Sequence, residues 1–473
     1  MDLFDKEERY MYDELKNESA LLNKPLSTNC QVPGNINKPR FYEFWQKVLK
    51  ANDTVLKILK DGYKIPFIDG VPPPPSMTKN NKSFLENKEF GITEIKRLEA
   101  LGCIYRVKDR PWVVLPLSVV YSKKWRLVVD CSRTLNPFVQ KIHVKLETLD
   151  EAESVLKKGD WQAISDLDSG YWHIGVSEES QKFLGIHYID EQGDVHYFQW
   201  KVLFLGLTDA VRIFTKMLKP HRAHLNRQGI RHNFFIDDQC VLGNSQQECF
   251  KNNSFALSVL RSAGWVVKEE KCSGPDQSTK FLGQIRDLNK MMYFCPESKK
   301  DKIFSEIENI LSKKKVHVRS LASLYGKIVS NRYSLGDIVR LMSRFGFRDI
   351  SAAPSWSAYI PVSSQVRFEL EFFKNNWVSL NGCLIRPEKH RVVVDCSTLQ
   401  VASDASAVGG YIYEVKSGSF AFKRAFELEE VAESSTSREF KVFEDFYDHF
   451  GEKLQGEAIV HYTGRDFSYI TSI

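Results

Sequence analysis

The stretch NFFIDDQCVLG, residues 233–243, decides the fold that this sequence predicts. Two adjacent aspartates, Asp237 and Asp238, interrupt a run of apolar and aromatic residues that favours two short strands joined by a tight turn. Burial of neighbouring carboxylates is costly unless a cation compensates their charge. The stretch therefore indicates a cation-binding hairpin. An ordinary polar turn is the alternative when the stretch is considered alone.

A third aspartate stands in a similar setting upstream. The sequence QAISDLDSGYWHI, residues 162–174, predicts a short apolar strand that ends at Asp166. Phosphoryl transfer commonly uses two divalent cations roughly 3.5–4 Å apart, and Mg²⁺ prefers hard oxygen ligands. A strand end and a hairpin can bring Asp166 together with Asp237 and Asp238. These three residues are therefore the candidate catalytic residues and the candidate ligands of two Mg²⁺ ions.

The order and context of these residues resemble the polymerase motifs of retroelement reverse transcriptases. The matching segments are KKWRLVVDCSRTLN (123–136), SDLDSGYWHI (165–174), FLGLTDAVRIFTKMLKP (204–220), FIDD (235–238), KEEKC (268–272) and FLGQI (281–285). The resemblance implies a right-hand polymerase with fingers, palm and thumb. It also implies an RNA-directed DNA polymerase, a nucleotidyltransferase that adds dNTPs to the 3′-hydroxyl of a primer on an RNA or DNA template.

The resemblance also assigns nucleotide-binding roles to five further residues. Lys124 and Arg126 fall on the fingers strand that contacts the incoming triphosphate, and an ion-paired surface strand is the alternative. Tyr171 takes the position beneath the nucleotide sugar, where its bulk favours deoxynucleotides. Gly206 lets the backbone approach the base or sugar, and Lys271 could protonate the leaving pyrophosphate. A packed aromatic, a glycine at the start of a helix and a solvated lysine are the alternatives for these three.

Three sequence segments resemble, more narrowly, the reverse transcriptases of DIRS-like retrotransposons. These elements pair a reverse transcriptase with a tyrosine recombinase. The similar segments are GYKIPF (62–67), RPWVVLPLSVV (110–120) and the motif that contains Gly206. Val211 replaces the proline and Phe235 the tyrosine that are usual at these positions, and both replacements are apolar. No recombinase, integrase or protease pattern is present in the sequence, so such proteins of the element are possible partners only.

The C-terminal segment of the chain, residues 396–473, resembles a ribonuclease H domain. The matching segments are VASDASAVGGYIYE (401–414), SSTSREFKVFEDF (434–446) and YTGRDFSYI (462–470). The resemblance implies that Asp404, Glu439 and Asp466 bind two further Mg²⁺ ions, and a small α/β domain with surface acids is the alternative. The chain ends at Ile473, before the last helices and the fourth carboxylate of such enzymes. We therefore expect an incomplete domain with weak or absent ribonuclease activity.

The length of 473 residues predicts about three domains. We expect an α+β protein with an N-terminal extension and linker over 1–80 and the fingers and palm over 81–296. A helical thumb or connection over 297–395 and the incomplete ribonuclease H-like domain over 396–473 follow. Within the extension, the apolar spacing from about Arg40 to Asp61 predicts one helix.

Composition is compatible with these expectations. A formal charge of +6 permits a polyanionic partner such as a template-primer. Nine scattered cysteines without a C-x-x-C pair indicate free thiols in a reducing compartment. The acidic N-terminus lacks the apolar core of a signal peptide, and no apolar run spans a bilayer. We expect an intracellular protein without membrane association, in the cytoplasm or the nucleus.

Two other functions are compatible with the same motifs. A degenerate or host-adopted copy would bind nucleic acid without catalysis, and the intact set of Asp166, Asp237 and Asp238 argues against it. An RNA-templated RNA polymerase would use the same palm. Tyr171 argues against this function because a ribonucleotide needs a smaller residue at that position.

Overall fold

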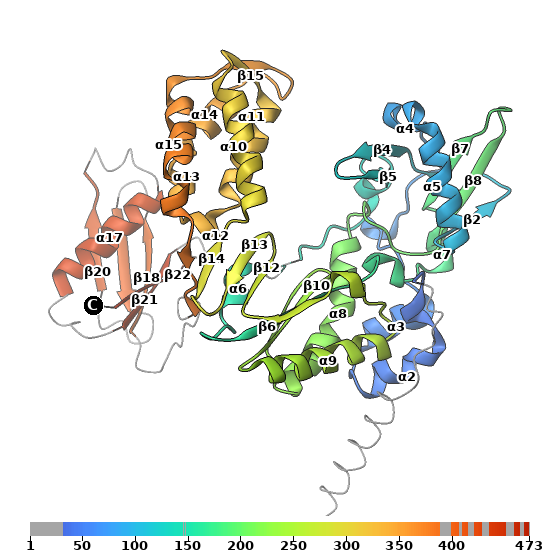
Figure 1. The fold of residues 1–473 in the computed structure, drawn as a ribbon, viewed down its shortest axis with the longest axis horizontal. Helices are drawn as coiled ribbons and strands as arrows, with labels where there is room; N and C mark the ends of the chain where they lie inside the picture. The colour runs from blue at the N-terminus through green and yellow to red at the C-terminus, as the bar shows by residue number, and fades with distance from the viewer. Residues whose placement is uncertain are drawn as a thin grey trace, which may run out of the picture. The chain divides into compact units, whose positions relative to one another are not determined.

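The structure is a computed structural model that describes residues 32–144, 146 and 148–387 and six shorter segments: 399–405, 409–414, 421–427, 435–450, 458–463 and 468–472. The chain divides into two compact units, Met1–Pro387 and Glu388–Ile473. Each unit is described by itself, and Figure 1 labels their helices and strands.

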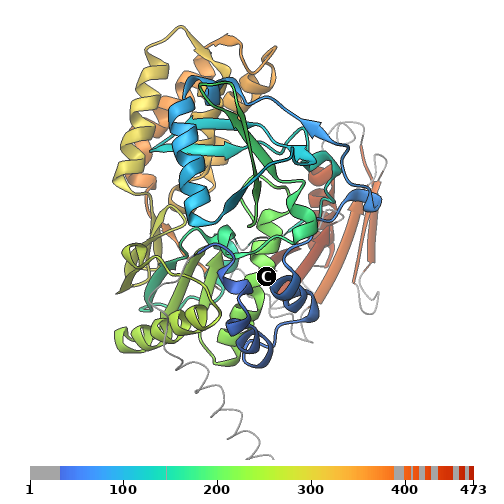
Figure 2. The same cartoon turned by 90° about the vertical axis from the view of Figure 1, so that its right-hand side faces the viewer.

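A four-stranded antiparallel sheet forms the centre of the larger unit, in the order β11-β6-β10-β9. Its strands are β6 (Trp161–Asp166), β9 (His232–Phe235), β10 (Asp238–Gly243) and β11 (Ser273–Asp276). Helices α8 (Ala210–Arg227) and α9 (Gln246–Ser262) lie against one face of this central sheet (Figures 1 and 2). The expected strand before Asp166 and the expected hairpin around Asp237 are both present.

Side chains of β10 alternate between two hydrophobic cores because successive residues of a strand point to opposite faces. Val241 belongs to the large core that α8 and α9 share, whereas Cys240 and Leu242 belong to a smaller core on the other face. Ile164 of β6 also lies in the smaller core. Asp238 and Asp166 are each two residues from one of these positions, so they lie on the face of the smaller core.

The smaller core is covered by a second four-stranded sheet in the order β12-β13-β14-β17. Its strands are β12 (Ser278–Phe281), β13 (Gln284–Asp287), β14 (Met292–Phe294) and β17 (Cys383–Leu384). The short helix α6 (Leu149–Glu153) adds Leu149 to this core and begins with a capping box between Thr148 and Glu151.

The segment before residue 80 contributes to the large core. The single helix expected from about 40 to 61 is two helices, α2 (Pro39–Lys47) and α3 (Asp53–Asp61), because Asn52 caps α3 through a 3.0 Å hydrogen bond from the Val55 amide. Trp45 is fully buried and donates to the Ala263 carbonyl at 2.8 Å. This contact crosses more than two hundred positions of sequence, so amphipathic spacing alone could not predict it.

A five-stranded sheet follows in the order β1-β3-β7-β8-β2. Its strands are β1 (Ser76–Met77), β2 (Ile104–Val107), β3 (Val113–Val114), β7 (Gly185–Ile189) and β8 (Val195–Trp200). A separate hairpin consists of β4 (Leu117–Tyr121) and β5 (Trp125–Val129). The accompanying helices are α4 (Lys82–Glu86), α5 (Lys88–Leu101) and α7 (Glu178–Gln181).

Residues 297–380 form a helical bundle with its own buried core. Its helices are α10 (Glu297–Leu311), α11 (Val318–Val329), α12 (Arg332–Leu335), α13 (Ile338–Leu341), α14 (Arg344–Ser351) and α15 (Ser364–Leu380). Strands β15 (Lys315–His317) and β16 (Tyr359–Pro361) pair within it. The buried carboxylate of Glu369 accepts hydrogen bonds from the Tyr325 hydroxyl at 2.7 Å and from the Phe345 and Gly346 amides at 2.8 and 2.9 Å. These bonds offset the cost of its burial.

The smaller unit contains a five-stranded sheet in the order β20-β19-β18-β21-β22. Its elements are β18 (Leu399–Ala405), β19 (Gly409–Glu414), β20 (Ala421–Ala425), α17 (Ser435–Phe450), β21 (Ala458–Thr463) and β22 (Ser468–Ser472). β18 pairs in parallel with β21, so α17 lies in the connection between them. Across both units, the described helices include none with the length and hydropathy needed to cross a membrane.

Candidate active site

Asp166 and Asp238 are directly opposite each other at one end of the central sheet. Asp166 is the last residue of β6, Asp238 is the first of β10, and the two are partners in the antiparallel register. Side chains of such a pair lie on the same face of a sheet with Cβ atoms about 5 Å apart. Asp166 is only 6% exposed, so its carboxylate lies where bulk water compensates its charge poorly.

Asp237 occupies the turn between β9 and β10. The residue before it, Ile236, has a φ of 56°, which is unusual for a β-branched residue and makes the turn tight. A Cβ atom at Gly170 would lie 3.8 Å from the Cβ of Asp237 and 2.8 Å from the Phe214 ring. Glycine at 170 therefore lets the segment after β6 pack closely on the Phe214 ring of α8, beside the turn that holds Asp237.

The three carboxylates repel one another. Burial, followed by the charges of Asp237 and Asp166, raises the pKa of Asp238 to about 6. Burial and the charge of Asp166 also raise the pKa of Asp237. The Lys271 ammonium forms an ion pair with Asp166 Oδ2, which raises the pKa of the lysine. The site therefore carries excess negative charge, which one lysine compensates in part.

The donor set suits a hard divalent cation. Carboxylate oxygens are the ligands that Mg²⁺ prefers, and three of them converge on one end of the sheet. No three His, Cys, Asp or Glu side chains within the described residues are already arranged around a single metal position. Lys271 instead contacts Asp166, and its side chain is 57% exposed.

Tyr171 lies beside the aspartates. It belongs to a short 3₁₀ helix, η4 (Gly170–His173), which follows β6 almost directly. Its ring packs on Phe214 of α8 with centroids 4.9 Å apart. Burial and the nearby charge of Asp237 raise the pKa of its hydroxyl to about 12. Tyr171 is thus both a packed aromatic and a neighbour of the candidate metal ligands, so the two interpretations of the sequence are compatible.

Gly206 lies in the loop that precedes α8 and is pressed against β5. Its φ is 131°, and a Cβ atom at this position would lie 2.8 Å from the Val129 carbonyl oxygen. The side chain of Asn136 holds the same loop. Its Nδ2 donates to the Gly206 carbonyl at 2.9 Å, and its Oδ1 accepts from the Thr208 backbone amide at 2.9 Å. Asn136 is the last residue of the segment 123–136, and no local pattern distinguishes it from its neighbours there.

Lys124 and Arg126 lie on the hairpin of β4 and β5. Lys124 is in the turn, Arg126 pairs in register with Val120, and both side chains are exposed. Within the described residues, neither forms an ion pair and neither is hydrogen-bonded to the aspartates. The structure therefore gathers Asp166, Asp237 and Asp238 with their neighbours, but it does not bring the two fingers cations to them.

A buried arginine that sequence reasoning missed supports the sheet below the site. Arg286 of β13 is fully buried and donates to Gln162 Oε1 at 2.8 Å, to Asn233 Oδ1 at 3.4 Å and to Cys240 Sγ at 2.8 Å. It thereby joins β13 to three strands of the central sheet. Arg286 directly follows the motif FLGQI (281–285), which was the only sequence signal for it. Its burial could not be predicted, because it depends on the packing of β13 against the central sheet.

The three ribonuclease H-like residues can be placed only in part. Asp404 lies in β18, in register with Tyr411 of β19. Glu439 lies in the first turns of α17. Asp466 lies outside the described residues, between β21 and β22.

Comparison with known proteins identifies the class of this fold. A foamy viral protease-reverse transcriptase in complex with RNA/DNA hybrid superposes with a TM-score of 0.58 at 18% identity, over 98% of this chain and 56% of that chain. The same protein in complex with dsDNA gives a TM-score of 0.56 at 18% identity, over 98% of this chain and 87% of that chain. The larger unit therefore has the right-hand polymerase fold, with the central sheet as its palm.

The family of the central segment follows from its sequence. Residues 114–285 match the model of the family described as reverse transcriptase (RNA-dependent DNA polymerase), so this chain contains a reverse transcriptase domain. The enzymatic polyprotein of figwort mosaic virus (strain DxS) is 25% identical over 219 residues, 45% of this chain and 31% of that protein. The Pol polyprotein from transposon 412 of Drosophila melanogaster is 26% identical over 169 residues, 34% of this chain and 12% of that protein. The chain thus spans a third or less of these relatives.

Proposed function

We propose that this protein is an RNA-directed DNA polymerase that adds deoxynucleotides to the 3′-hydroxyl of a primer. The observation that carries the proposal is the cross-strand pair of Asp166 and Asp238 with Asp237 in the adjoining turn. The raised pKa values of Asp237 and Asp238 support it, because such carboxylates gain most from a bound cation.

The oxygens of Asp166, Asp237 and Asp238 would hold two Mg²⁺ ions. When bound, these ions would activate the attacking hydroxyl and stabilise the charge of the leaving pyrophosphate. Lys271, which forms an ion pair with Asp166, would be the residue that donates a proton to the leaving pyrophosphate. Lys124 and Arg126 are exposed on the hairpin of β4 and β5. They would neutralise the triphosphate oxygens of a dNTP bound between this hairpin and the three aspartates.

The polymer substrate is proposed to be an RNA or DNA template paired with a primer. The two foamy viral structures with this fold hold RNA/DNA hybrid and dsDNA, which supports a duplex of this kind. Tyr171 supports a preference for dNTPs, since its packing on Phe214 leaves it little freedom to withdraw from a ribose 2′-hydroxyl.

The element of origin is proposed to be a DIRS-like retrotransposon, on the strength of the segments around Lys64, Val114 and Val211. The smaller unit is proposed to be ribonuclease H-like. Its parallel pair β18 and β21, connected through α17, supports this proposal, with Asp404 on the first strand and Glu439 on the helix. Two further Mg²⁺ ions would bind there if that unit cleaves RNA.

Primer extension on an RNA template with dNTPs and Mg²⁺ tests the polymerase. We expect Asp237→Asn to lower the extension rate by about a thousandfold or more, because it weakens a metal ligand needed in the transition state. The same variant should bind a template-primer as well as the wild type. Asp301→Asn is the matched control, since Asp301 is an exposed residue of α10.

Two results would contradict the proposal. Equal extension by wild type and Asp237→Asn would show that the activity resides elsewhere. A folded wild type that binds template-primer but extends it with neither Mg²⁺ nor Mn²⁺ would favour the alternative of a degenerate nucleic-acid-binding protein.

A further inference from the structure

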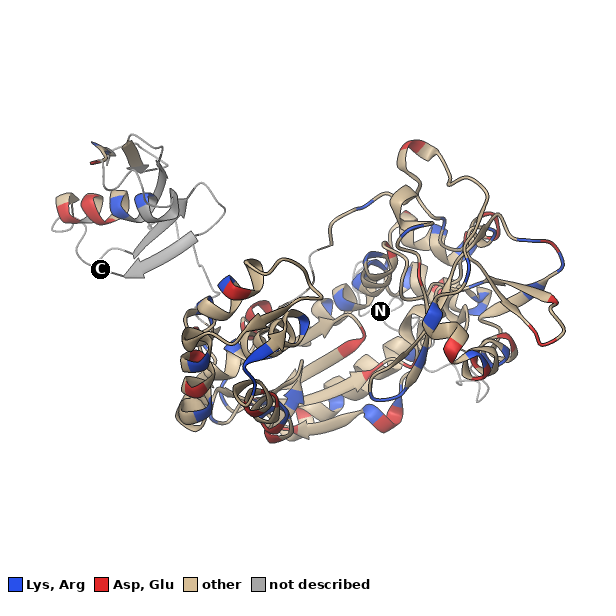
Figure 3. Ribbon diagram, turned by 90° about the horizontal axis from the view of Figure 1, so that it is seen from above, with Lys and Arg blue, Asp and Glu red and all other residues tan. Residues whose placement is uncertain are grey.

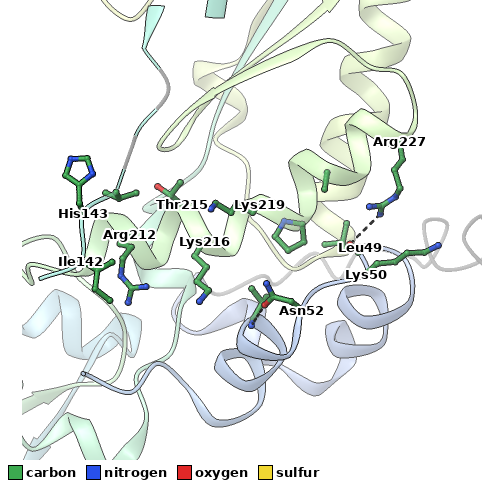
Figure 4. Close-up of a pocket in the computed structure, with 14 residues that line it drawn as sticks. Leu49, Lys50, Asn52, Ile142, His143, Arg212, Thr215, Lys216, Lys219 and Arg227 are labelled. Atoms are coloured by element: carbon green, nitrogen blue, oxygen red, sulfur yellow. Dashed lines mark hydrogen bonds between the residues drawn. The ribbon is translucent and has the colours of Figure 1, made fainter. Parts of the chain in front are cut away.

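A basic cavity of about 550 Å³ lies on α8, apart from the three aspartates. Its walls are α8, the residues that join α2 to α3, and the extended segment 142–144 (Figure 4). The basic residues that line it are Lys50, Arg212, Lys216, Lys219 and Arg227, together with His143. None of the described residues in this lining is Asp or Glu.

This concentration of positive charge differs from the rest of the surface. Figure 3 shows Lys and Arg interspersed with Asp and Glu over most of the described elements. In the cavity, Arg212 is fixed by an ion pair with Asp209, and Arg227 donates to the Val48 carbonyl at 3.1 Å. Two lysines between them, Lys216 and Lys219, form no ion pair with any described residue. The cavity therefore combines anchored cations with cations that are available to a ligand.

The surroundings of Lys216 disfavour its positive charge. Partial burial, together with the charges of Arg212 and Lys219, lowers its pKa. In Figure 4 its side chain extends from α8 on the side of Asn52. A bound anion would remove the repulsion among the three cations, so the arrangement favours an anionic ligand.

The cations form a stripe along one face of α8 rather than a single point. Arg212, Lys216, Lys219 and Arg227 follow one another at intervals of four, three and eight residues, which places them on the same side of a helix. From first to last they cover roughly 22 Å at about 1.5 Å per residue. One phosphate group would occupy only part of this length, whereas a row of phosphates would match it.

The cavity also limits the width of the ligand. Its volume is in the range of about 300–1,000 Å³ that is typical of small-ligand sites. It suits a few nucleotides of one strand and is too small for a duplex. Ile142 and Val55 add apolar surface to the lining, against which sugars or bases could pack.

We propose that this cavity and the Arg212–Arg227 face of α8 bind the phosphodiester backbone of single-stranded nucleic acid. The site would hold an unpaired strand outside the polymerase site. The proposal does not rest on the proposed polymerase activity, because none of the three aspartates lines the cavity.

Binding of the full chain to a labelled oligothymidylate, measured over a series of salt concentrations without dNTPs, tests the proposal. The variant is Lys216→Gln with Lys219→Gln, which removes two charges and retains most of the side-chain length. We expect affinity to fall about tenfold and the salt slope to decrease by about 1.4, since each contact to a single strand contributes about 0.7. Binding of a blunt duplex should be unchanged. Replacement of both lysines by Arg should retain oligothymidylate affinity.

Lys251→Gln is the matched control, because Lys251 is an exposed lysine on α9 that forms no ion pair with a described residue. Thermal melting verifies that each variant is folded. An unchanged salt slope in the double Gln variant, or an equal loss in Lys251→Gln, would overturn the proposal. So would displacement of the oligothymidylate by inorganic triphosphate at equal phosphate concentration, because the site would then recognise an isolated phosphate group.

Discussion

Asp238 lies where its charge opposes two others, opposite Asp166 and next to Asp237. Its pKa of about 6 in the folded protein exceeds the ordinary value of 3.8. The folded state therefore binds more protons than the unfolded chain between these values, and stability falls as pH rises from about 4 to about 6. The same arrangement that supports metal binding thus destabilises the metal-free protein.

We predict that Asp238→Asn stabilises the metal-free protein near neutral pH, because it removes a negative charge that burial and the two neighbouring carboxylates both disfavour. The expected gain is on the order of 1 kcal/mol after allowance for solvent screening, and it should vanish near pH 4, where the wild-type carboxyl is protonated. Urea unfolding in EDTA at the two pH values measures it. Asp301→Asn, at an exposed position, should show no such pH dependence. A gain of equal size at both pH values would refute the buried charge of Asp238 as its cause.

Whole elements in this protein are positioned by backbone contacts that particular residues permit. The loop before α8 lies against β5 because Gly206 has no Cβ atom, and Asn136 fixes it with two hydrogen bonds. The segment FLGLTDAV resembles the glycine motif of reverse transcriptases, and the structure supplies the physical reason for its glycine. A side chain there would push the loop from Val129 and shift the start of α8.

Gly206→Ala is therefore expected to destabilise the protein by about 1–3 kcal/mol, through its positive φ and the contact with Val129. Primer extension should fall as well, since α8 carries Phe214 beneath Tyr171. Thermal or urea unfolding gives the stability change. Gly326→Ala is the control, because Gly326 lies in α11 with open space around its Cβ position and should be neutral or up to about 1 kcal/mol more stable. Matching losses in the two variants would contradict a role for the Val129 contact.

At the scale of the whole molecule, the chain contains two units with separate cores. Helices and strands of Met1–Pro387 form three clusters of buried apolar residues within the described part, and Ile412, Val442 and Phe446 form the centre of another in Glu388–Ile473. Separate cores favour independent folding.

Residues 1–387 alone are therefore expected to fold cooperatively and to extend a primer at a rate within about twofold of the full chain, as separate domains generally fold as units. Circular dichroism melting and the primer-extension assay check this. Loss of cooperative unfolding in the shorter chain would show that its core depends on residues 388–473.

The sequence by itself determined the three candidate aspartates and the strands that carry them. An apolar hairpin around two aspartates and a strand that ends in a third have local signatures, because alternation and turn chemistry are properties of neighbouring residues. The right-hand polymerase fold followed from the order of these motifs.

Tertiary structure decided what depends on contacts between distant residues. The register that sets Asp166 opposite Asp238, the burial of Trp45 and Arg286, and the role of Asn136 all join segments far apart in sequence. The same is true of the basic cavity, whose lining residues come from three separate segments. Local patterns carry no information on such distances, because burial and electrostatic coupling arise only when the chain has packed.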